Sequence, residues 1–177
     1  MNPSNSQELE IRNARSEEFV SIGKLMASVY SQLEGFPKAS EQPDYYKMLL
    51  NVGTLTEKEN TELIVAISNK GKMVGAVVYF SDMKNYGSGG TATKIKNASG
   101  FRLLAVDFQE RGKEIGKRLC KACIDRAKGK NQKELYIHST ESIKVAWGMY
   151  ERLGFTRCEA IDFIQGELPV FGFKLSI

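Results

Sequence analysis

Apolar residues recur along the first half of the chain with two different periods. Strict alternation predicts a strand over residues 9–14, and apolar spacings of three and four predict a helix over residues 16–33. A second helix is expected to begin at Asp44. Residues 61–82 have the composition of a β-hairpin whose turn lies at residues 69–72. The first half therefore predicts the order strand, helix, helix, strand, strand.

The second half begins with a nearly continuous apolar run at residues 100–108, which is typical of a strand buried on both faces. A helix is expected from Ile115 to Lys128, a buried strand over 134–140 and a helix over 142–153. Gly129 and Gly154 are suited to ending the two helices, and the tail predicts two strands around residues 166–169. This order predicts an α+β (mixed α/β) fold. A twisted, mostly antiparallel sheet of about seven strands would be flanked by about four helices.

One domain is expected over residues 1–177, with residues 1–8 flexible. The polar, Gly-rich segment 83–99 is long for a structureless connection inside a compact domain. It is expected to be either a lid or substrate loop, or plain disorder. Tyr86 in its middle is a candidate for contact with a substrate.

The composition is that of a soluble globular protein, with 42% hydrophobic and 26% charged residues. No apolar run approaches the length of a membrane span, and the N-terminus lacks the pattern of a secretory signal. Three cysteines, an odd number, argue against a disulfide framework and favour a reducing cytoplasm. A cytoplasmic protein without a membrane partner is therefore expected.

The formal net charge of +4 gives only a mild preference for anionic partners. Lys and Arg are dense between residues 111 and 133, which is most often a solvated helix face. A nucleic-acid-binding helix is the weaker alternative, because no aromatic residue is interleaved with the basic ones. No nucleic-acid partner is expected.

The turn before Ile115 combines the features of an anion-binding site. The buried strand ends at Val106, Gly112 lies in the turn, and no Ser, Thr, Asp or Asn caps the helix. Free N–H groups and the helix dipole would point at this turn, which Lys and Arg surround. The alternative is an ordinary strand–helix turn with solvated amides. The glycine spacing matches neither a Walker A loop nor a dinucleotide-binding fingerprint.

Four segments between residues 100 and 155 have distinctive sequences, which are, in chain order, FRLLAV, RGKEIGKRL, LYIHST and AWGMYERLGF. The second resembles the acetyl-coenzyme A signature Gln/Arg-x-x-Gly-x-Gly/Ala of the GNAT superfamily of N-acetyltransferases. The fourth resembles that family's Ala-x-x-x-Tyr-x-x-x-Gly-Phe helix end. Glu114 stands at the first signature glycine, and its carboxylate must point outwards if the resemblance holds. Ile143 stands where many members carry Asn.

The resemblance implies a single GNAT domain that transfers an acetyl group from acetyl-coenzyme A to a primary amine of a small molecule or peptide. The turn amides would hold the pyrophosphate, and the preceding strand would pair with the pantetheine arm. A backbone N–H near Ala105 or Val106 would stabilise the oxyanion, and Tyr150 would protonate the departing thiolate. The implied cofactor-binding residues are Leu104, Ala105, Val106, Arg111, Gly112, Lys113, Glu114, Ile115, Gly116 and Lys117.

His138, the single histidine, and Glu141 are candidates for contact with the substrate or for accepting the amine proton. The alternatives are structural: a satisfied strand residue for His138 and a core aromatic for Tyr150. No metal is expected, since Cys120 and Cys123 have no second cysteine pair.

The acceptor is not predicted, and the tail strands could pair in a homodimer. A non-catalytic acyl-coenzyme A binding or sensing module remains an alternative function, because it would bind the same cofactor and transfer nothing.

Overall fold

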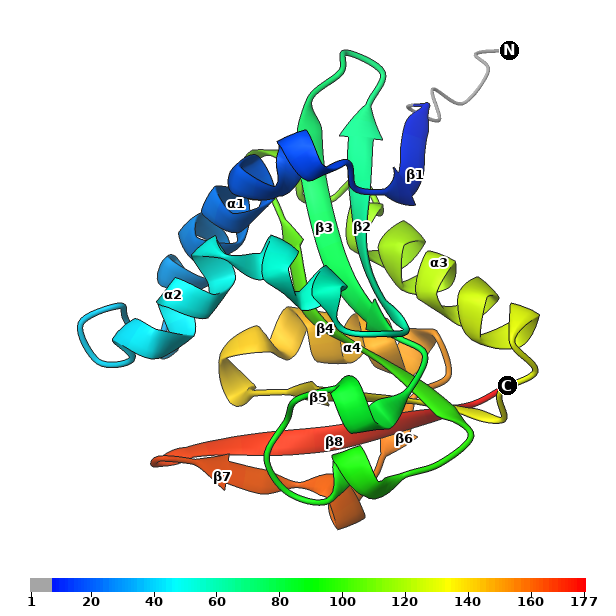
Figure 1. Cartoon of the computed structure of the whole chain (residues 1–177). Coiled ribbons are helices and arrows are strands. Elements are labelled where there is room, and N and C mark those ends of the chain that lie inside the picture. Colours follow the sequence, from blue (N-terminus) through cyan, green and yellow to red (C-terminus); the bar gives the residue numbers. More distant parts are fainter. Residues whose placement is uncertain (1–7) are drawn as a thin grey trace.

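The computed structural model describes residues 8–177 (Figure 1). The expected flexibility of residues 1–8 therefore concerns, apart from Glu8, residues outside this range. The α-helices are α1 (Phe19–Ser31), α2 (Pro43–Leu50), α3 (Ile115–Gly129) and α4 (Lys144–Arg152). The strands are β1 (Leu9–Asn13), β2 (Thr61–Ser68), β3 (Met73–Phe80), β4 (Ala98–Val106), β5 (Glu134–Ser139), β6 (Thr156–Arg157), β7 (Phe163–Gln165) and β8 (Leu168–Ser176). None of the described helices has both the length and the apolar character that crossing a membrane demands.

The strands form one sheet in the order β1-β2-β3-β4-β5-β8-β6, and β7 pairs with β8. Among the described strands, β4 and β5 make the one parallel pair, and every other pair is antiparallel. The parallel pair follows from the crossover through α3, which returns the chain to the same end of the sheet. The expected α+β fold with a mixed, mostly antiparallel sheet is confirmed.

The C-terminal tail differs from the two strands expected there. It forms three, because the two-residue β6 pairs with Phe173 and Lys174 in the second half of β8, and β7 pairs with the start of β8. Two residues are too few for alternation to be visible in a sequence. The pattern therefore found the β7–β8 hairpin and missed β6.

Alternation along the central strands divides the hydrophobic core into two layers. Val65 and Val78 pack with buried residues of α1 and α2, whereas Ile64 and Val77 pack with buried residues of α3 and α4. Figure 1 shows α1 and α2 on one side of the sheet and α3 on the other. Both faces of β2, β3 and β4 are thus covered, as their nearly continuous apolar runs indicate.

A β-bulge interrupts β4 at the centre of the sheet. The register with β3 shifts between the pairs Ala76–Ala105 and Val78–Arg102, and Leu103 takes the left-handed conformation with φ 60°. A bulge inserts an unpaired residue and bends the strand. The bend in β4 lies just beyond the point where its pairing with β5 stops, and this position matters for the site described below.

The segment 83–99 is an ordered part of the fold, held by the side chain of Tyr86. Two short 3₁₀ turns, Met83–Asn85 and Ala92–Lys94, shape it. Tyr86 is 0% exposed, and a Cβ at Gly100 would lie 2.8 Å from its ring, so a glycine there lets the ring lie on β4. Plain disorder, one of the two alternatives for this segment, does not describe it.

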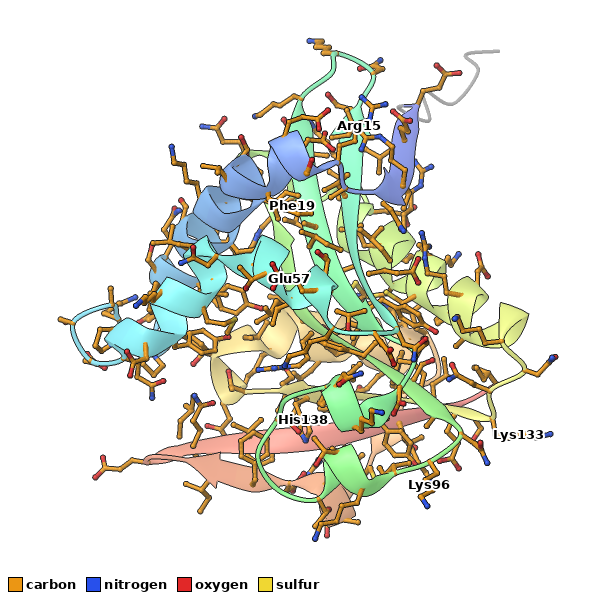
Figure 2. All side chains as sticks on the ribbon, viewed as in Figure 1. Arg15, Phe19, Glu57, Lys96, Lys133 and His138 are labelled. Atoms are coloured by element: carbon orange, nitrogen blue, oxygen red, sulfur yellow. The ribbon has the colours of Figure 1, made fainter. Side chains whose placement is uncertain are left out.

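His138 joins this segment to the chain before β7. Its Nε2 lies 2.8 Å from the carbonyl oxygen of Ile161, and its Nδ1 lies 3.0 Å from the hydroxyl of Tyr86. A carbonyl only accepts, so Nε2 carries the proton, and in the neutral ring Nδ1 accepts from the hydroxyl. Figure 2 shows His138 beside the segment that crosses in front of β5 and β8. Burial lowers the pKa of His138, because the charged ring would be poorly solvated there.

This lowered pKa predicts how stability depends on pH. The unfolded chain takes up a proton near the ordinary histidine pKa of about 6.5, which the folded chain resists, so the free energy of unfolding should fall as the pH drops below that value. Urea denaturation between about pH 5 and pH 8 measures this slope. Because the chain has one histidine, the His138→Gln variant should lose this part of the slope. Equal slopes in both proteins would contradict the assignment.

Candidate active site

The pairing between β4 and β5 is short, and it leaves part of β4 without a neighbour. The two strands pair only through Ala98–Gly100 and Glu134–Tyr136. The N–H of Asp107 donates to the carbonyl of Val74 on β3 at 3.0 Å. Because main-chain groups alternate along a strand, the N–H of Val106 points to the β5 side instead. The end of β4 thus offers unpaired main-chain groups to the gap between the two strands.

Leu104 contributes the carbonyl on that same side of β4. Its oxygen accepts a hydrogen bond from the hydroxyl of Tyr30 on α1 at 3.2 Å. A carbonyl has two lone pairs, so one acceptor site on this oxygen remains after that bond. The unpaired edge therefore presents both a donor, at Val106, and an acceptor, at Leu104.

The helix α3 begins without a side-chain cap. Glu114 is its N-cap residue, and its side chain makes no capping bond. The first helical hydrogen bond runs from the N–H of Arg118 to the carbonyl of Glu114 at 3.0 Å. Within residues 8–177, no acceptor pairs with the N–H groups of Ile115, Gly116 and Lys117. These groups and the helix dipole make the turn attractive to an anion.

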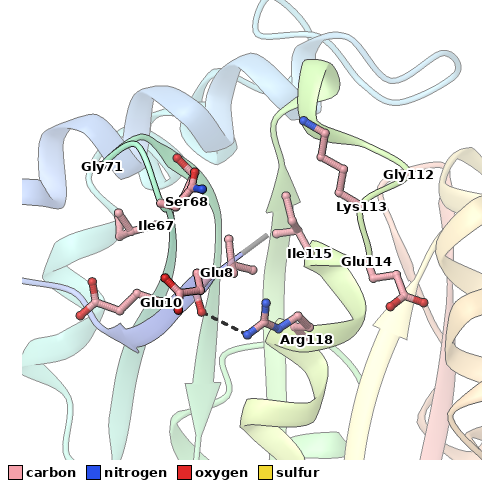
Figure 3. A pocket seen from close by; sticks show the side chains of 12 residues that line it. Glu8, Glu10, Ile67, Ser68, Gly71, Gly112, Lys113, Glu114, Ile115 and Arg118 are labelled. Carbon is pink, nitrogen blue, oxygen red and sulfur yellow. Dashed lines mark hydrogen bonds between the residues drawn. The ribbon is translucent and has the colours of Figure 1, made fainter. Parts of the chain in front are cut away.

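The backbone at Glu114 has a conformation that glycine adopts more easily than other residues do. Its φ is 62°, in the left-handed region that costs a residue with a side chain about 1 kcal/mol. Its side chain is 72% exposed and lies 3.7 Å from Nζ of Lys117. Figure 3 shows the carboxylate directed away from Arg118 and the β1 edge. The carboxylate is therefore exposed to solvent, on the side of the turn away from β1, and Glu114 also lines the cavity described below.

The basic residues around the turn fall into two groups. Lys113 is paired with Glu110 at 2.6 Å, and Arg118 donates to the carbonyl of Leu9 at 3.1 Å, where it lines a groove against β1 (Figure 3). Arg111 instead lies over the ring of Phe108, 3.8 Å from its centroid, and no carboxylate of residues 8–177 lies within 4.0 Å of it. The spacing of basic residues in the sequence does not distinguish Lys113 and Arg118, which have hydrogen-bond partners, from Arg111, which has no carboxylate nearby.

A cavity of about 430 Å³ connects the β4 edge with the start of α3. Its walls come from α1, β4, α3 and α4, and they are mainly apolar. The lining residues are Val29, Tyr30, Leu33, Leu104, Val106, Glu110, Arg111, Gly112, Glu114, Ile115, Gly116, Lys117, Ser142, Ile143, Val145, Ala146, Met149, Arg152 and Leu153. All the expected cofactor-binding residues except Ala105 and Lys113 are among them.

Sequence reasoning missed much of this lining, including Tyr30, Met149 and Arg152. Tyr30 lies on α1, 74 positions before Leu104, which it contacts. A contact between residues so far apart cannot be predicted from the pattern of neighbouring residues. Met149 and Arg152 follow Ala146 at intervals of three on α4. That spacing defines one helix face, so these two could have been identified once Ala146 was assigned to the site.

Tyr150 lies behind the cavity wall, not on it. It is 5% exposed and packs against Phe101, Phe155 and Phe173 with ring centroids 6.1, 5.7 and 6.3 Å away. Its hydroxyl has no hydrogen-bond partner in the described part of the chain. Burial raises the pKa of Tyr150 well above its usual value, because the charged phenolate would be poorly solvated there. The phenol is therefore a weaker acid than an exposed tyrosine.

The three candidates for substrate contact do not lie together. Tyr86 and His138 are bonded to each other, and both ring nitrogens of His138 are engaged. Glu141 is exposed after β5 and lines a separate hollow with Leu168 and Pro169. Among residues 8–177, no group of three or more His, Cys, Asp and Glu side chains is arranged to hold a metal ion.

Solved structures share this fold. An acetyltransferase of the GNAT family from Staphylococcus aureus Mu50 is 18% identical, with a TM-score of 0.72 over 96% of this chain and 99% of its own. PaiA N-acetyltransferase from Thermoplasma acidophilum, in complex with coenzyme A, is 15% identical with a TM-score of 0.69 over 93% and 98%. The ribosomal-protein-S18-alanine N-acetyltransferase from Escherichia coli is 16% identical with a TM-score of 0.64 over 96% and 94%.

The sequence comparisons give a family. A search of curated proteins finds no significant match. The family model described as acetyltransferase (GNAT) family matches residues 25–155 of the 177, a range that contains β4, α3, β5 and α4. The structure has an unpaired β4 edge and an uncapped start of α3, and the family model matches most of the length of the chain. This chain belongs to the GNAT family of acetyltransferases.

Proposed function

We propose that the protein transfers an acetyl group from acetyl-coenzyme A to a primary amine of a small molecule or peptide. The observation that supports this most is that two sets of unpaired main-chain groups meet in one cavity. These are the N–H groups at the start of α3 and the edge of β4 at Leu104 and Val106. An acyl-coenzyme A has anionic phosphates and an amide-bearing arm, which are the complements of these two sets.

The phosphates would be held at the start of α3. The N–H groups of Ile115, Gly116 and Lys117 are the donors, and Arg111, Lys117 and Arg152 supply positive charge around the same cavity. Gly116 suits close approach, since a Cβ added there would find no atom nearer than 3.5 Å. Lys113 and Arg118, which are engaged elsewhere, have a smaller part in this role.

The pantetheine arm would pair with β4. Val106 has a free N–H and Leu104 a carbonyl with a free lone pair, so an amide-bearing chain can add to β4 as a strand does. The N–H of Val106 is also the donor available to an acyl oxygen in the gap, and a fixed donor at that position stabilises developing negative charge. Bound there, acetyl-coenzyme A supplies an acetyl thioester that is reactive towards a neutral amine.

Tyr150 is the proposed proton donor to the leaving sulfur. Its support is the position that the resemblance gives it and a hydroxyl that has no partner in residues 8–177. Because burial raises its pKa, the phenol can act as the acid only if the bound thioester lowers that pKa again. His138 has no free nitrogen with which to accept the amine proton, so that proton would leave through water. The proposal also includes a cytoplasmic location, which the three free cysteines favour. It further includes a homodimer in which the tail strands of two copies pair.

The role of Tyr150 predicts a selective loss in the Tyr150→Phe variant. Turnover should fall about a hundredfold or more, the usual size of a general-acid effect, because the leaving thiolate loses its proton donor. Acetyl-coenzyme A affinity should stay the same, since the ring and its packing are kept. Release of free thiol measures turnover, and calorimetry measures affinity. A fully active variant would remove Tyr150 from this role.

The phosphate site predicts a charge effect that depends on position. In the double variant Arg111→Glu, Lys117→Glu, acetyl-coenzyme A should bind on the order of a hundredfold more weakly, through loss of charge-assisted hydrogen bonds. The matched control is Lys113→Glu, Arg118→Glu, which makes the same change of net charge at residues engaged elsewhere. Calorimetry at one salt concentration compares the two. Equal weakening would mean that only net charge matters.

Glu114 predicts a gain that two substitutions can separate. Glu114→Gly should raise the free energy of unfolding by about 1 kcal/mol, since glycine adopts positive φ without strain. It should also tighten acetyl-coenzyme A binding, because a carboxylate near the turn is removed. Glu114→Ala removes the charge and keeps the strain, so it should tighten binding without the gain in stability. Denaturation showing Ala and Gly variants equally stable would refute the backbone explanation.

A further inference from the structure

Arg102 is the one charged residue of β4, and its surroundings give it no partner of opposite charge. The strand reads ASGFRLLAV, so the guanidinium stands among small and apolar residues at the centre of the sheet. Arg102 pairs with Val78, which belongs to the layer under α1 and α2. It is half-buried, and within residues 8–177 no carboxylate lies within 4.0 Å of it.

The guanidinium is nevertheless held in a fixed place. Its Nη1 donates to the main-chain carbonyl of Tyr86 at 2.9 Å, and its Cζ lies 5.6 Å from the centroid of the Tyr86 ring. A Cβ at Gly87 would lie 3.2 Å from Nη1, so the chain passes directly over it. This one bond uses one of five N–H donors. Such a side chain is oriented before any ligand arrives.

Arg102 also lines a hollow of about 570 Å³ between α2, the segment 83–99 and β7. Its lining residues are Glu41, Gln42, Pro43, Asp44, Tyr45, Met48, Leu55, Lys58, Gly87, Arg102 and Gln165. The other charged groups, Glu41, Asp44 and Lys58, are exposed and carry no net positive charge between them. Arg102 is thus the one cation of this lining that is not exposed, and the proposed selection for an anion depends mainly on it.

The hollow lies next to the proposed acetyl donor cavity. Tyr45 lines the hollow and Tyr30 lines the cavity, and their rings meet edge to face with centroids 6.3 Å apart. Arg102 itself precedes Leu104 by two residues, across the bulge at Leu103. A molecule held at Arg102 is thus near the β4 edge from the face opposite to α3 and α4.

We propose that Arg102 binds the carboxylate of the acetyl acceptor, so that the acceptor is an amine that also carries a carboxylate, as an amino acid does. The planar fork of a guanidinium matches a carboxylate with two parallel hydrogen bonds. A half-buried cation without a partner is better satisfied by such a ligand than by a neutral amine. This inference rests on the proposed acetyl transfer and names its substrate class.

Matched pairs of amines test the proposal. L-phenylalanine is compared with phenethylamine, and L-lysine with 1,5-diaminopentane, by thiol release from acetyl-coenzyme A. The carboxylate-bearing member of a productive pair should have a kcat/KM at least about tenfold higher. In Arg102→Gln that preference should disappear, because kcat/KM for the carboxylate member falls by about as much as the wild-type preference while that for the other member changes little. Arg102→Lys, which keeps the charge but not the fork, should recover part of it.

A binding arm separates this proposal from the proposed function. N-acetyl-L-phenylalanine and N-acetyl-L-lysine should bind the wild type by calorimetry and bind Arg102→Gln at least tenfold more weakly, while acetyl-coenzyme A binds both proteins alike. Equal binding of the acetylated products to both proteins would overturn the role of Arg102, as would turnover of amines without preference for a carboxylate. Product binding that depends on Arg102, with no amine acetylated, would instead refute acetyl transfer and leave Arg102 as a carboxylate site.

Discussion

The short pairing of β4 with β5 is the constraint on which the site depends. Only three residues of each strand pair, and the bulge at Leu103 bends β4 just beyond them. A fully paired sheet would have consumed the N–H of Val106 and the carbonyl of Leu104 in its ladder. Because the ladder stops, these groups remain available in the middle of the sheet, where a buried polar group needs a partner. A ligand with amide groups meets that need.

The same reasoning applies to the start of α3. A helix leaves its first N–H groups without intrahelical partners, and here no side chain replaces them. The chain even accepts a left-handed Glu114 at that point, which allows the turn to present its N–H groups to the cavity. The left-handed residue, the missing cap and the nearby cations have a common cause if an anion completes the turn. None of the three has an evident benefit in an ordinary solvated turn.

Most of the fold could be predicted from sequence because its signals are local. The β-rich runs and turn residues of β2 and β3, the apolar runs of β4 and β5 and the helical spacing of α3 each lie within one segment. The site was harder, since its members are separated in sequence. The pattern placed Arg118 and Arg111 together, although one contacts β1 and the other faces the cavity. Which face of α3 a basic residue occupies depends on packing against β1, which no local pattern contains.

The acceptor side was hardest to predict, and the reason is visible at Arg102. In sequence it is a single charge inside a buried strand, with no motif around it. Its significance comes from what the fold brings to it, namely the carbonyl and ring of Tyr86 and the backbone at Gly87.

Tyr30 then joins the two sides, because its hydroxyl fixes the Leu104 carbonyl while its ring packs on Tyr45. Tyr30 lines the cavity and Tyr45 lines the hollow, so this one ring contact lies between the proposed donor and acceptor sites. In the proposed reaction α1 would therefore help to shape the site, although it carries none of the family's motifs.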